Sequence, residues 1–239
     1  MIDELDSLCM PNLSVVVPTL NEENSIDRCL DSIGFDDGVD VVMSDGGSSD
    51  RTVSLAAARG AAVVEGPPGR GGQLNRGAAA ATGDVLLFLH ADCVLPSGWQ
   101  DALTSALADS QTSLTCFLLR TEPECPRAGS RLGGLWLRTL DLRARGGRLP
   151  YGDQAFGVRR EVFDRVGGFP DIPLMEDLAF ARACRRVGEI RRLPLEIRTT
   201  ARRTARHPFR ARLMMLVFPS LFQLGVSPAT LARWYGNAR

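Results

Sequence analysis

The chain has 239 residues, of which 44% are hydrophobic and 23% charged, with 24 glycines and 14 prolines. This size and composition exclude a disordered chain, collagen and a small disulfide-stapled scaffold, and predict one folded domain over residues 1–239. All 28 basic residues are arginines. The lack of lysine excludes a phosphate-binding loop that ends in Gly-Lys-Ser/Thr, a Schiff-base lysine and a lysine general base.

The formal net charge of zero hides an uneven distribution. Residues 1–119 carry 17 acids and 5 arginines, whereas residues 120–239 carry 11 acids and 23 arginines. The basic half suits an anionic partner, although arginines scattered over solvated helices account for the same count. The six cysteines lack metal-site spacing and are typical of buried or free thiols in a reducing cytosol. No secretory signal is visible at the acidic N-terminus, which favours a cytoplasmic location.

Apolar runs alternate with helical spacings along the first half of the chain. Runs such as LSVVVP and DVLLFL are short, apolar and rich in branched residues, and therefore indicate buried strands. The predicted strands span 13–18, 39–43, 61–65 and 84–89. The predicted helices span 24–33, 51–59, 73–82 and 97–108. This order predicts an α/β fold, with a Rossmann-like, mostly parallel sheet and helices on both faces.

The alternation ends near residue 113. Two more strands are expected at 114–119 and 155–158, with helices at 161–166, 175–187, 208–223 and 228–235. Residues 121–152 are rich in Arg, Gly and Pro, contain an apolar-spaced segment at 132–142, and are expected to shape a binding site. The apolar stretch Leu213–Val226 is too short to span a bilayer. The arginines at its head fit a helix lying on a membrane surface, and a helix packed on the core explains the pattern equally well.

Chemistry-bearing residues follow the predicted strands, and ligands of α/β sheets bind beyond the carboxyl ends of strands. Asp45 precedes two glycines, and its carboxylate suits hydrogen bonds from a base or a ribose hydroxyl; a plain Asp-Gly turn is the alternative. His90 and Asp92 leave the strand at 84–89. Such a pair suits Mg²⁺ or Mn²⁺, which prefer one or two carboxylates plus phosphate oxygens, whereas a turn-capping acid beside a packed histidine is the alternative.

Further candidates lie near predicted helix starts. Arg70, among glycines before a helix, suits phosphate binding, although a flexible turn explains the pattern equally. Glu176 and Asp177 open a predicted helix, where one carboxylate can serve as a general base or both can simply complement the helix dipole. Arg202 and Arg203 suit a diphosphate, an anionic lipid or plain solvation.

Taken together, these segments resemble the family-two glycosyltransferases, which have the A-type nucleotide-sugar-binding fold. Five stretches occur in the family's order and nearly span the chain. They are VVVPTLNEE (15–23), VVMSDGGSSDRT (41–52), GRGGQLNRGAAAATGDVLLFLHAD (69–92), GVRREVFDRVGGFP (157–170) and LMEDLAFARACRR (174–186). The YGDQAFGVRR stretch and the LGVSPATLARWY ending are similar to a bacterial subgroup often encoded near radical-SAM or selenium-related genes. The resemblance implies a nucleotide-sugar half at 13–112, and an acceptor and catalytic half with C-terminal helices at 113–239.

The resemblance also implies residue roles. The expected nucleotide-binding residues are Pro18, Thr19, Leu20, Glu22, Asp45, Gly46, Arg70, Asn75, Ala91, Arg202 and Arg203. Asp45 would read the uracil edge, and Arg70 would contact the diphosphate. The expected metal ligands, for Mn²⁺ or Mg²⁺, are Asp92 and His90, and the expected catalytic residues are Asp177 as general base and Glu176 beside it. The implied reaction is an inverting sugar transfer from a nucleotide sugar, a UDP-sugar, to a hydroxyl acceptor.

Two positions depart from the family pattern. His90 stands where the metal motif has its first acid, and Thr204 stands where an aromatic residue follows the Arg-Arg pair. A histidine can still ligate Mn²⁺ or bond a ribose hydroxyl. The alternatives are a nucleotide-sugar-binding protein without turnover and a sugar-phosphate nucleotidyltransferase, which usually carries a lysine near its N-terminus. The expected acceptor is lipid or anionic, with no nucleic acid, and the C-terminal helix is a candidate for contact with the inner face of a membrane.

Overall fold

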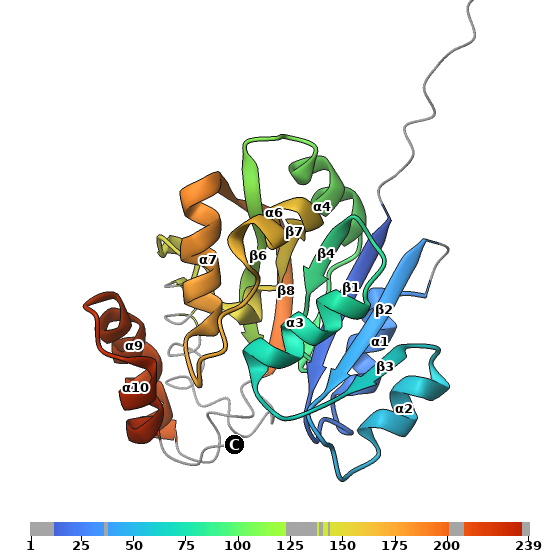
Figure 1. Ribbon diagram of the computed structural model, residues 1–239, viewed down its shortest axis with the longest axis horizontal. Helices are drawn as coiled ribbons and strands as arrows, with labels where there is room; N and C mark the ends of the chain where they lie inside the picture. Colours follow the sequence, from blue (N-terminus) through green and yellow to red (C-terminus); the bar gives the residue numbers. More distant parts are fainter. Residues whose placement is uncertain are drawn as a thin grey trace, which may run out of the picture.

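The computed structural model describes residues 12–35, 38–122, 138, 141–142, 144–200 and 208–235, with the backbone alone for 208–215. Its eight-stranded sheet has the order β3-β2-β1-β4-β7-β6-β8-β5 (Figure 1). The strands are β1 (Leu13–Thr19), β2 (Val39–Asp45), β3 (Ala62–Glu65), β4 (Val85–Phe88), β5 (Cys93–Val94), β6 (Thr112–Glu122), β7 (Phe156–Arg159) and β8 (Glu189–Thr200). Strands from both predicted halves thus share one sheet.

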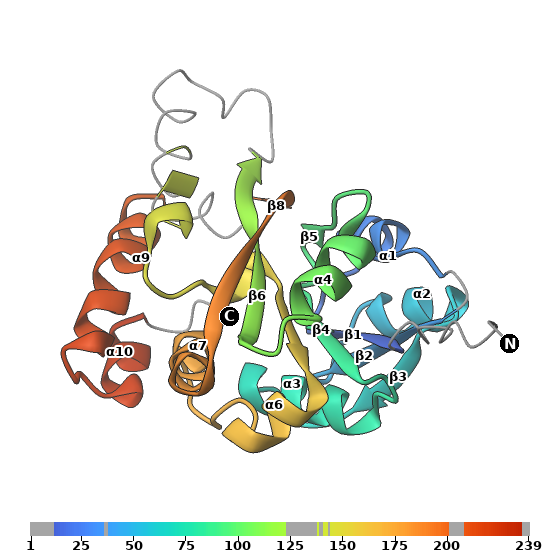
Figure 2. The same cartoon turned by 90° about the horizontal axis from the view of Figure 1, so that it is seen from above.

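The helices cover both faces of this sheet. They are α1 (Ile26–Ile33), α2 (Thr52–Ala58), α3 (Arg70–Ala80), α4 (Trp99–Leu107), the short 3₁₀ helix η2 (Gly152–Gln154), α6 (Arg160–Val166), α7 (Glu176–Val187), α9 (Pro208–Gln223) and α10 (Pro228–Tyr235). Figure 2 shows α1 and α4 on one side, and α3, α6 and α7 on the other. Because both faces are covered, successive residues of a central strand enter different cores: Val15 and Val17 pack in one, and Val16 packs in the other.

The pairing confirms a mixed α/β fold with a largely parallel first half. β3, β2, β1 and β4 run parallel, whereas β7 is antiparallel to both β4 and β6. β8 runs parallel to β6, and the short β5 runs antiparallel to β8. The carboxyl ends of β1, β2, β4, β6 and β8 therefore lie at one edge of the sheet, as the sequence predicts for the ligand-binding edge.

Two elements, α3 and β8, depart from prediction in ways that their packing explains. The helix expected to begin at 73 begins at Arg70. Gly71, which was assigned to a loop, serves close packing instead, because a Cβ on it would lie 2.5 Å from the carbonyl oxygen of Pro170. The sequence analysis also missed β8. Charged residues alternate there with buried Leu193 and Ile197, and a bulge opposite Phe117 and Leu118 accommodates Pro194, which lacks an N–H group.

Arg159, the last residue of β7, and Arg160, the first residue of α6, tie this part of the sheet to a helix on each face. Arg159 Nη1 donates to the Leu107 carbonyl oxygen at 2.6 Å, at the end of α4. Arg160 Nη2 donates to the Ala81 carbonyl oxygen at 2.8 Å, just beyond α3. In both cases a guanidinium binds the carboxyl end of a helix, where the helix dipole favours positive charge. The pair thus fixes both helices against β7.

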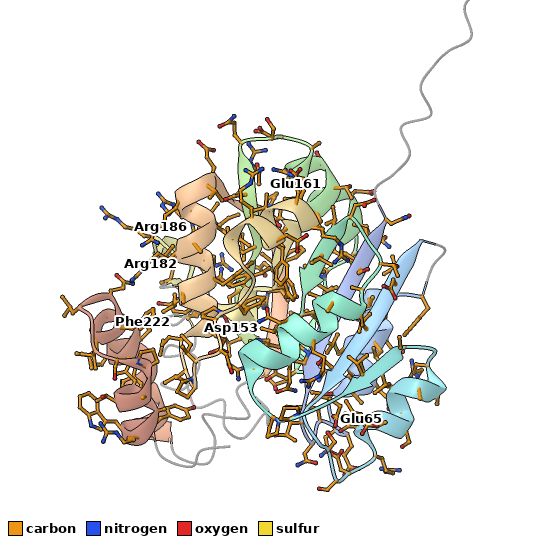
Figure 3. All side chains as sticks on the ribbon, in the orientation of Figure 1. Glu65, Asp153, Glu161, Arg182, Arg186 and Phe222 are labelled. Atoms are coloured by element: carbon orange, nitrogen blue, oxygen red, sulfur yellow. The ribbon has the colours of Figure 1, made fainter. Side chains whose placement is uncertain are left out.

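The predicted bounds of the two C-terminal helices, 208–223 and 228–235, are confirmed. The helices pack on each other through Phe218 and Tyr235, whose ring centroids lie 6.3 Å apart. Arg182 of α7 lies over the Phe222 ring at 5.2 Å, and Figure 3 labels both side chains. In the described part of the chain, no helix combines the length and apolar character needed to cross a bilayer. The predicted segment 132–142 lies mostly outside the described residues.

Candidate functional site

The carboxyl ends of β1 and β2 meet where Thr19 pairs with Asp45. The Asp45 side chain is 1% exposed and accepts four hydrogen bonds. The donors are Thr19 Oγ1 at 3.0 Å, Gly47 N at 2.8 Å, Ser48 N at 2.7 Å and Ser48 Oγ at 2.5 Å. Burial alone would raise the pKa of this carboxyl, but these bonds outweigh it and hold the pKa below its usual value. Its four acceptor sites are thus engaged in building the turn, and a contact with a base stays a prediction.

Gln73, which the sequence analysis did not single out, ties these strand ends to α3. Its Nε2 donates to the carbonyl oxygens of Thr19 at 2.8 Å and Ser44 at 3.0 Å, and its Oε1 accepts from Gly69 N at 3.2 Å. A Cβ on Gly46 would lie 3.0 Å from Gln73 Nε2, so the glycine allows this close approach. The available signal was a glutamine in the first turn of a helix after a glycine-rich loop.

α3 and α7 begin with side chains that form an ion pair. Arg70 Nη1 lies 3.2 Å from Glu176 Oε1, and the Glu176 side chain is almost fully buried. Burial alone would lower the pKa of the Arg70 guanidinium, but three nearby carboxylates outweigh it and keep that pKa raised. They belong to Glu176, Asp177 and Asp92. The structure therefore brings together charged residues from three segments that the sequence analysis treated separately: the start of α3, the start of α7 and the loop after β4.

The Asp177 carboxylate is held by one N–H group from each of two segments. Its Oδ1 accepts from Leu178 N at 2.7 Å, and its Oδ2 accepts from Gly152 N at 2.9 Å. Burial, followed by the charge of neighbouring Glu176, raises the pKa of Asp177 to about 6, against the lowering effects of Gly152 N–H and Arg70. A carboxyl with this pKa is ionised at neutral pH and basic enough to accept a proton, as a general base requires.

A cavity of about 10 Å³, roughly the room of one water molecule, lies beside this carboxylate. Its lining combines charged and apolar groups: Arg70, Leu74, Phe88, His90, Gly152, Phe156, Phe169 and Asp177. Below it, rings from four elements pack with centroids 4.1–6.2 Å apart. They are Phe88, Phe156, Phe163, Phe169 and Phe180. This apolar floor accounts for the poor solvation of the carboxyl.

His90 and Asp92 follow β4, which lies between β1 and β7 in the sheet. His90 lines the cavity with Asp177, and Asp92 is partly buried with the Cys93 thiol 3.8 Å from its Oδ1. Within the described ranges, no group of three or more His, Cys, Asp or Glu side chains is arranged to hold a metal ion. A carboxylate and an imidazole alone fit a cation that takes further ligands from phosphate oxygens, as Mg²⁺ and Mn²⁺ do.

Asn75 is engaged elsewhere in this structure. Its Nδ2 donates to the Phe169 carbonyl oxygen at 2.7 Å, and its Oδ1 accepts from Phe169 N at 2.9 Å. The amide thus pins the turn at Gly168, whose φ is +69°. The predicted nucleotide contact of Asn75 stays a prediction, and the role that the structure gives this side chain is to hold the segment leading to α7.

Pro18, Leu20 and Glu22, which are also predicted nucleotide contacts, lie at the end of β1. Glu22 is buried and its Oε2 accepts from Ser25 Oγ at 2.8 Å, while its backbone N–H donates to Thr52 Oγ1 at 2.8 Å. Pro18 and Leu20 are partly exposed, whereas Ala91 is buried. Arg202 and Arg203 lie outside the described residues.

Sequence comparisons show related proteins. The family model of glycosyl transferase family 2 matches residues 14–167. An uncharacterized glycosyltransferase of Mycobacterium bovis is 37% identical over 172 residues, which cover 66% of this chain and 75% of that protein. Glucosyl-3-phosphoglycerate synthase of Mycobacterium tuberculosis is 41% identical over 96 residues, 35% of this chain. The match spans 30% of that synthase's length.

Solved structures share the fold. A mannosyltransferase from Pyrobaculum calidifontis, in complex with GDP-Man and Mn²⁺, has a TM-score of 0.66 at 24% identity and covers 92% of this chain and 66% of its own. Glucosyl-3-phosphoglycerate synthase from Mycobacterium tuberculosis, in complex with Mn²⁺, UDP-Glc and phosphoglyceric acid, has a TM-score of 0.58 at 28% identity. That likeness covers 78% of this chain and 70% of the synthase.

Proposed function

Because the chain belongs to glycosyl transferase family 2, we propose that it transfers a sugar from a UDP-sugar to a hydroxyl acceptor with inversion. The observation that carries the proposal is the convergence of Arg70, His90 and Asp177 on one cavity at the ligand-binding edge of the sheet. The synthase solved with UDP-Glc and Mn²⁺ supports a uridine nucleotide. Within the family, the YGDQAFGVRR stretch supports the bacterial subgroup encoded near radical-SAM or selenium-related genes.

Asp177 takes the proton in this reaction. The acceptor oxygen forms a bond to the anomeric carbon from the face opposite the diphosphate, and the bond from that carbon to the diphosphate oxygen breaks. The acceptor's proton passes to the Asp177 carboxylate, whose two oxygens are oriented by Gly152 N–H and Leu178 N–H. One displacement inverts the configuration, and a base held at hydrogen-bonding distance supplies about 10²–10⁴-fold of the acceleration.

The remaining predicted residues hold the donor. Arg70 binds the diphosphate through charge-assisted hydrogen bonds, and its ion pair with Glu176 orients the guanidinium toward the cavity. Arg202 and Arg203 are assigned to the same diphosphate by the resemblance to the family. The turn built on Asp45 frames the base and ribose together with the loop at the end of β1, which contains Pro18, Thr19, Leu20 and Glu22.

Asp92 and His90 would hold the divalent cation, Mn²⁺ or Mg²⁺. When bound, the cation neutralises negative charge on the diphosphate leaving group. The chain's contribution is to fix these two ligands on the short loop that follows β4, which is buried along its length. The nearby guanidinium of Arg70 then meets the same diphosphate from the α3 side.

The pH dependence of transfer tests this assignment. UDP release from UDP-sugars is measured with Mn²⁺ between pH 5 and 8.5, with phosphoglyceric acid and a long-chain lipid alcohol as acceptors. Because the base acts only when deprotonated, the rate should rise with pH, reach half its maximum near the Asp177 pKa of about 6, and level off above it. A rate that is constant through this range contradicts the base assignment, and UDP binding without sugar loss from any donor favours a binding protein without turnover.

We further propose that the α9–α10 hairpin rests on the inner face of a membrane, which places the acceptor nearby. Leu224 is 82% exposed and Trp234 is 50% exposed, and three arginines occur at the head of the apolar helix. Leu224→Ser should weaken co-sedimentation with phosphatidylglycerol vesicles, whereas Leu142→Ser, a matched change at a residue 66% exposed elsewhere, should not. Equal sedimentation of the wild type with and without vesicles contradicts this placement.

A further inference from the structure

η2 lies next to both His90 and Asp177, the proposed metal ligand and the proposed general base. A Cβ on Gly152 would lie 3.0 Å from His90 Nε2 and 3.4 Å from Asp177 Cβ, so a side chain at this position would push against the histidine. Figure 3 labels Asp153 of the same turn, near the start of α3. The Cys93 thiol, directly after Asp92, donates to the Asp153 carbonyl oxygen at 3.6 Å. The turn therefore touches both the β4 loop and α7.

The turn is anchored by one buried amide. Gln154 is 0% exposed; its Oε1 accepts from Tyr151 N at 3.0 Å, and its Nε2 donates to the Phe117 carbonyl oxygen on β6 at 2.9 Å. Its own backbone N–H donates to the Tyr151 carbonyl oxygen at 3.0 Å. The side chain thus closes the turn on itself and fastens it to the sheet.

The residue after the turn shows why an anchor is needed. Ala155 has a φ of +48°, a left-handed conformation that a residue with a Cβ seldom adopts. Such a conformation is strained and persists where surrounding contacts enforce it. The two side-chain hydrogen bonds of Gln154, immediately before it, supply such contacts. Without them the chain would relax, and the direction of Gly152 N–H would change.

We propose that Gln154 is a positioning residue for sugar transfer: its amide fixes η2 so that Gly152 N–H holds Asp177 Oδ2 in the orientation that faces the acceptor. The inference rests on the proposed function and adds a residue that does not touch substrate. Charged groups also act on this carboxylate: Arg70 from α3 and Glu176 from α7. Because the amide of Gln154 is uncharged, its contribution is orientation and not charge.

The test compares kcat with KM in two variants and a control. Gln154→Met removes both side-chain hydrogen bonds, and Gln154→Glu keeps an acceptor for Tyr151 N–H while losing the donor to Phe117. The control, Thr115→Val, removes another buried side-chain bond between β6 and β7, from Thr115 Oγ1 to the Gly157 carbonyl oxygen at 3.2 Å. A purely structural role would make the Gln154 variants behave as the control does.

Gln154→Met should lower kcat about 10- to 100-fold with the donor KM unchanged within about twofold, as expected when a reacting group is misplaced by a fraction of an ångström. Gln154→Glu should show a smaller loss, and Thr115→Val should keep the wild-type kcat. Only a Gln154 variant that folds, as shown by a native circular dichroism spectrum, is used to judge the proposal. If that variant has a wild-type kcat, or if its donor KM rises by the same factor by which kcat/KM falls, the positioning role of Gln154 is wrong and the proposed function stands. If the wild type itself transfers no sugar, the proposed function is wrong as well.

Discussion

Asp177→Asn is expected to lower kcat by about 10³-fold while the affinity for UDP changes by less than about twofold. Asparagine keeps the size of the side chain but cannot accept the acceptor's proton. In the proposed site the donor is held by Arg70 and by the ends of β1 and β2, and the substitution keeps the ion pair of Arg70 with Glu176 and the pairing of these strands. Single-turnover transfer and UDP titration calorimetry measure the two quantities separately.

Asp171→Asn is the matched control for this change. It removes an exposed carboxylate from the segment before α7 and should leave kcat unaltered. Full activity of Asp177→Asn would show that another group takes the proton. A parallel loss of UDP affinity would show that Asp177 binds the donor, which also contradicts its assignment as the base.

Arg70→Met is expected to act on stability and on the pH profile together. It removes the cation 3.2 Å from a Glu176 carboxylate that is only 2% exposed, and an uncompensated buried charge of this kind costs about 1–3 kcal/mol of unfolding free energy. Because Arg70 is also one of the influences that lower the pKa of Asp177, that pKa should move above 6. The acidic limb of the rate profile should therefore shift to higher pH, and the donor KM should rise.

A double-variant comparison separates these effects. Adding Glu176→Gln to Arg70→Met removes the unpaired charge and should restore most of the lost stability in urea denaturation, but not the donor KM. Arg51→Met is the control, because Arg51 pairs with Glu23 at 3.3 Å on the surface and little stability should depend on it. If Arg70→Met is as stable as the wild type and binds the donor equally well, the ion pair does not organise the site.

The first half of the fold could be predicted because its signals are local. Apolar runs gave β1 through β4, and helical spacing gave the helices between them. β8 was not predicted because charged residues interrupt its apolar pattern. Its proline, Pro194, lies in a bulge that becomes visible only from the pairing with β6. The start of α3 at Arg70 was not predicted because the reason for a glycine at position 71 is its close approach to Pro170, a residue about one hundred positions away in the sequence.

The chemical groups of the site could be anticipated from one rule, that parallel strands end at a common edge. That rule predicted that the loops after β1, β2 and β4 would meet, and the parallel pairing places the carboxyl ends of these strands at one edge of the sheet. The rule did not predict that Arg70 and Asp177 would join His90 at one cavity, which only the structure shows. The supporting amides could not be found in this way. Gln73 and Gln154 bind backbone atoms of distant strands, and the sequence around each glutamine does not show which backbone atoms its amide reaches.

Calorimetric titration of UDP into the protein, with and without Mn²⁺, tests most directly whether the nucleotide and the cation bind at the proposed site. The variant Asp92→Asn serves as the comparison. Binding should be strong with Mn²⁺, at least about tenfold weaker without it, and insensitive to Mn²⁺ in Asp92→Asn, because the cation would join that carboxylate to the diphosphate. GDP and TDP serve as competitors and should bind more weakly. UDP affinity that is the same with and without Mn²⁺ in the wild type, or the same manganese effect in Asp92→Asn, would contradict the account.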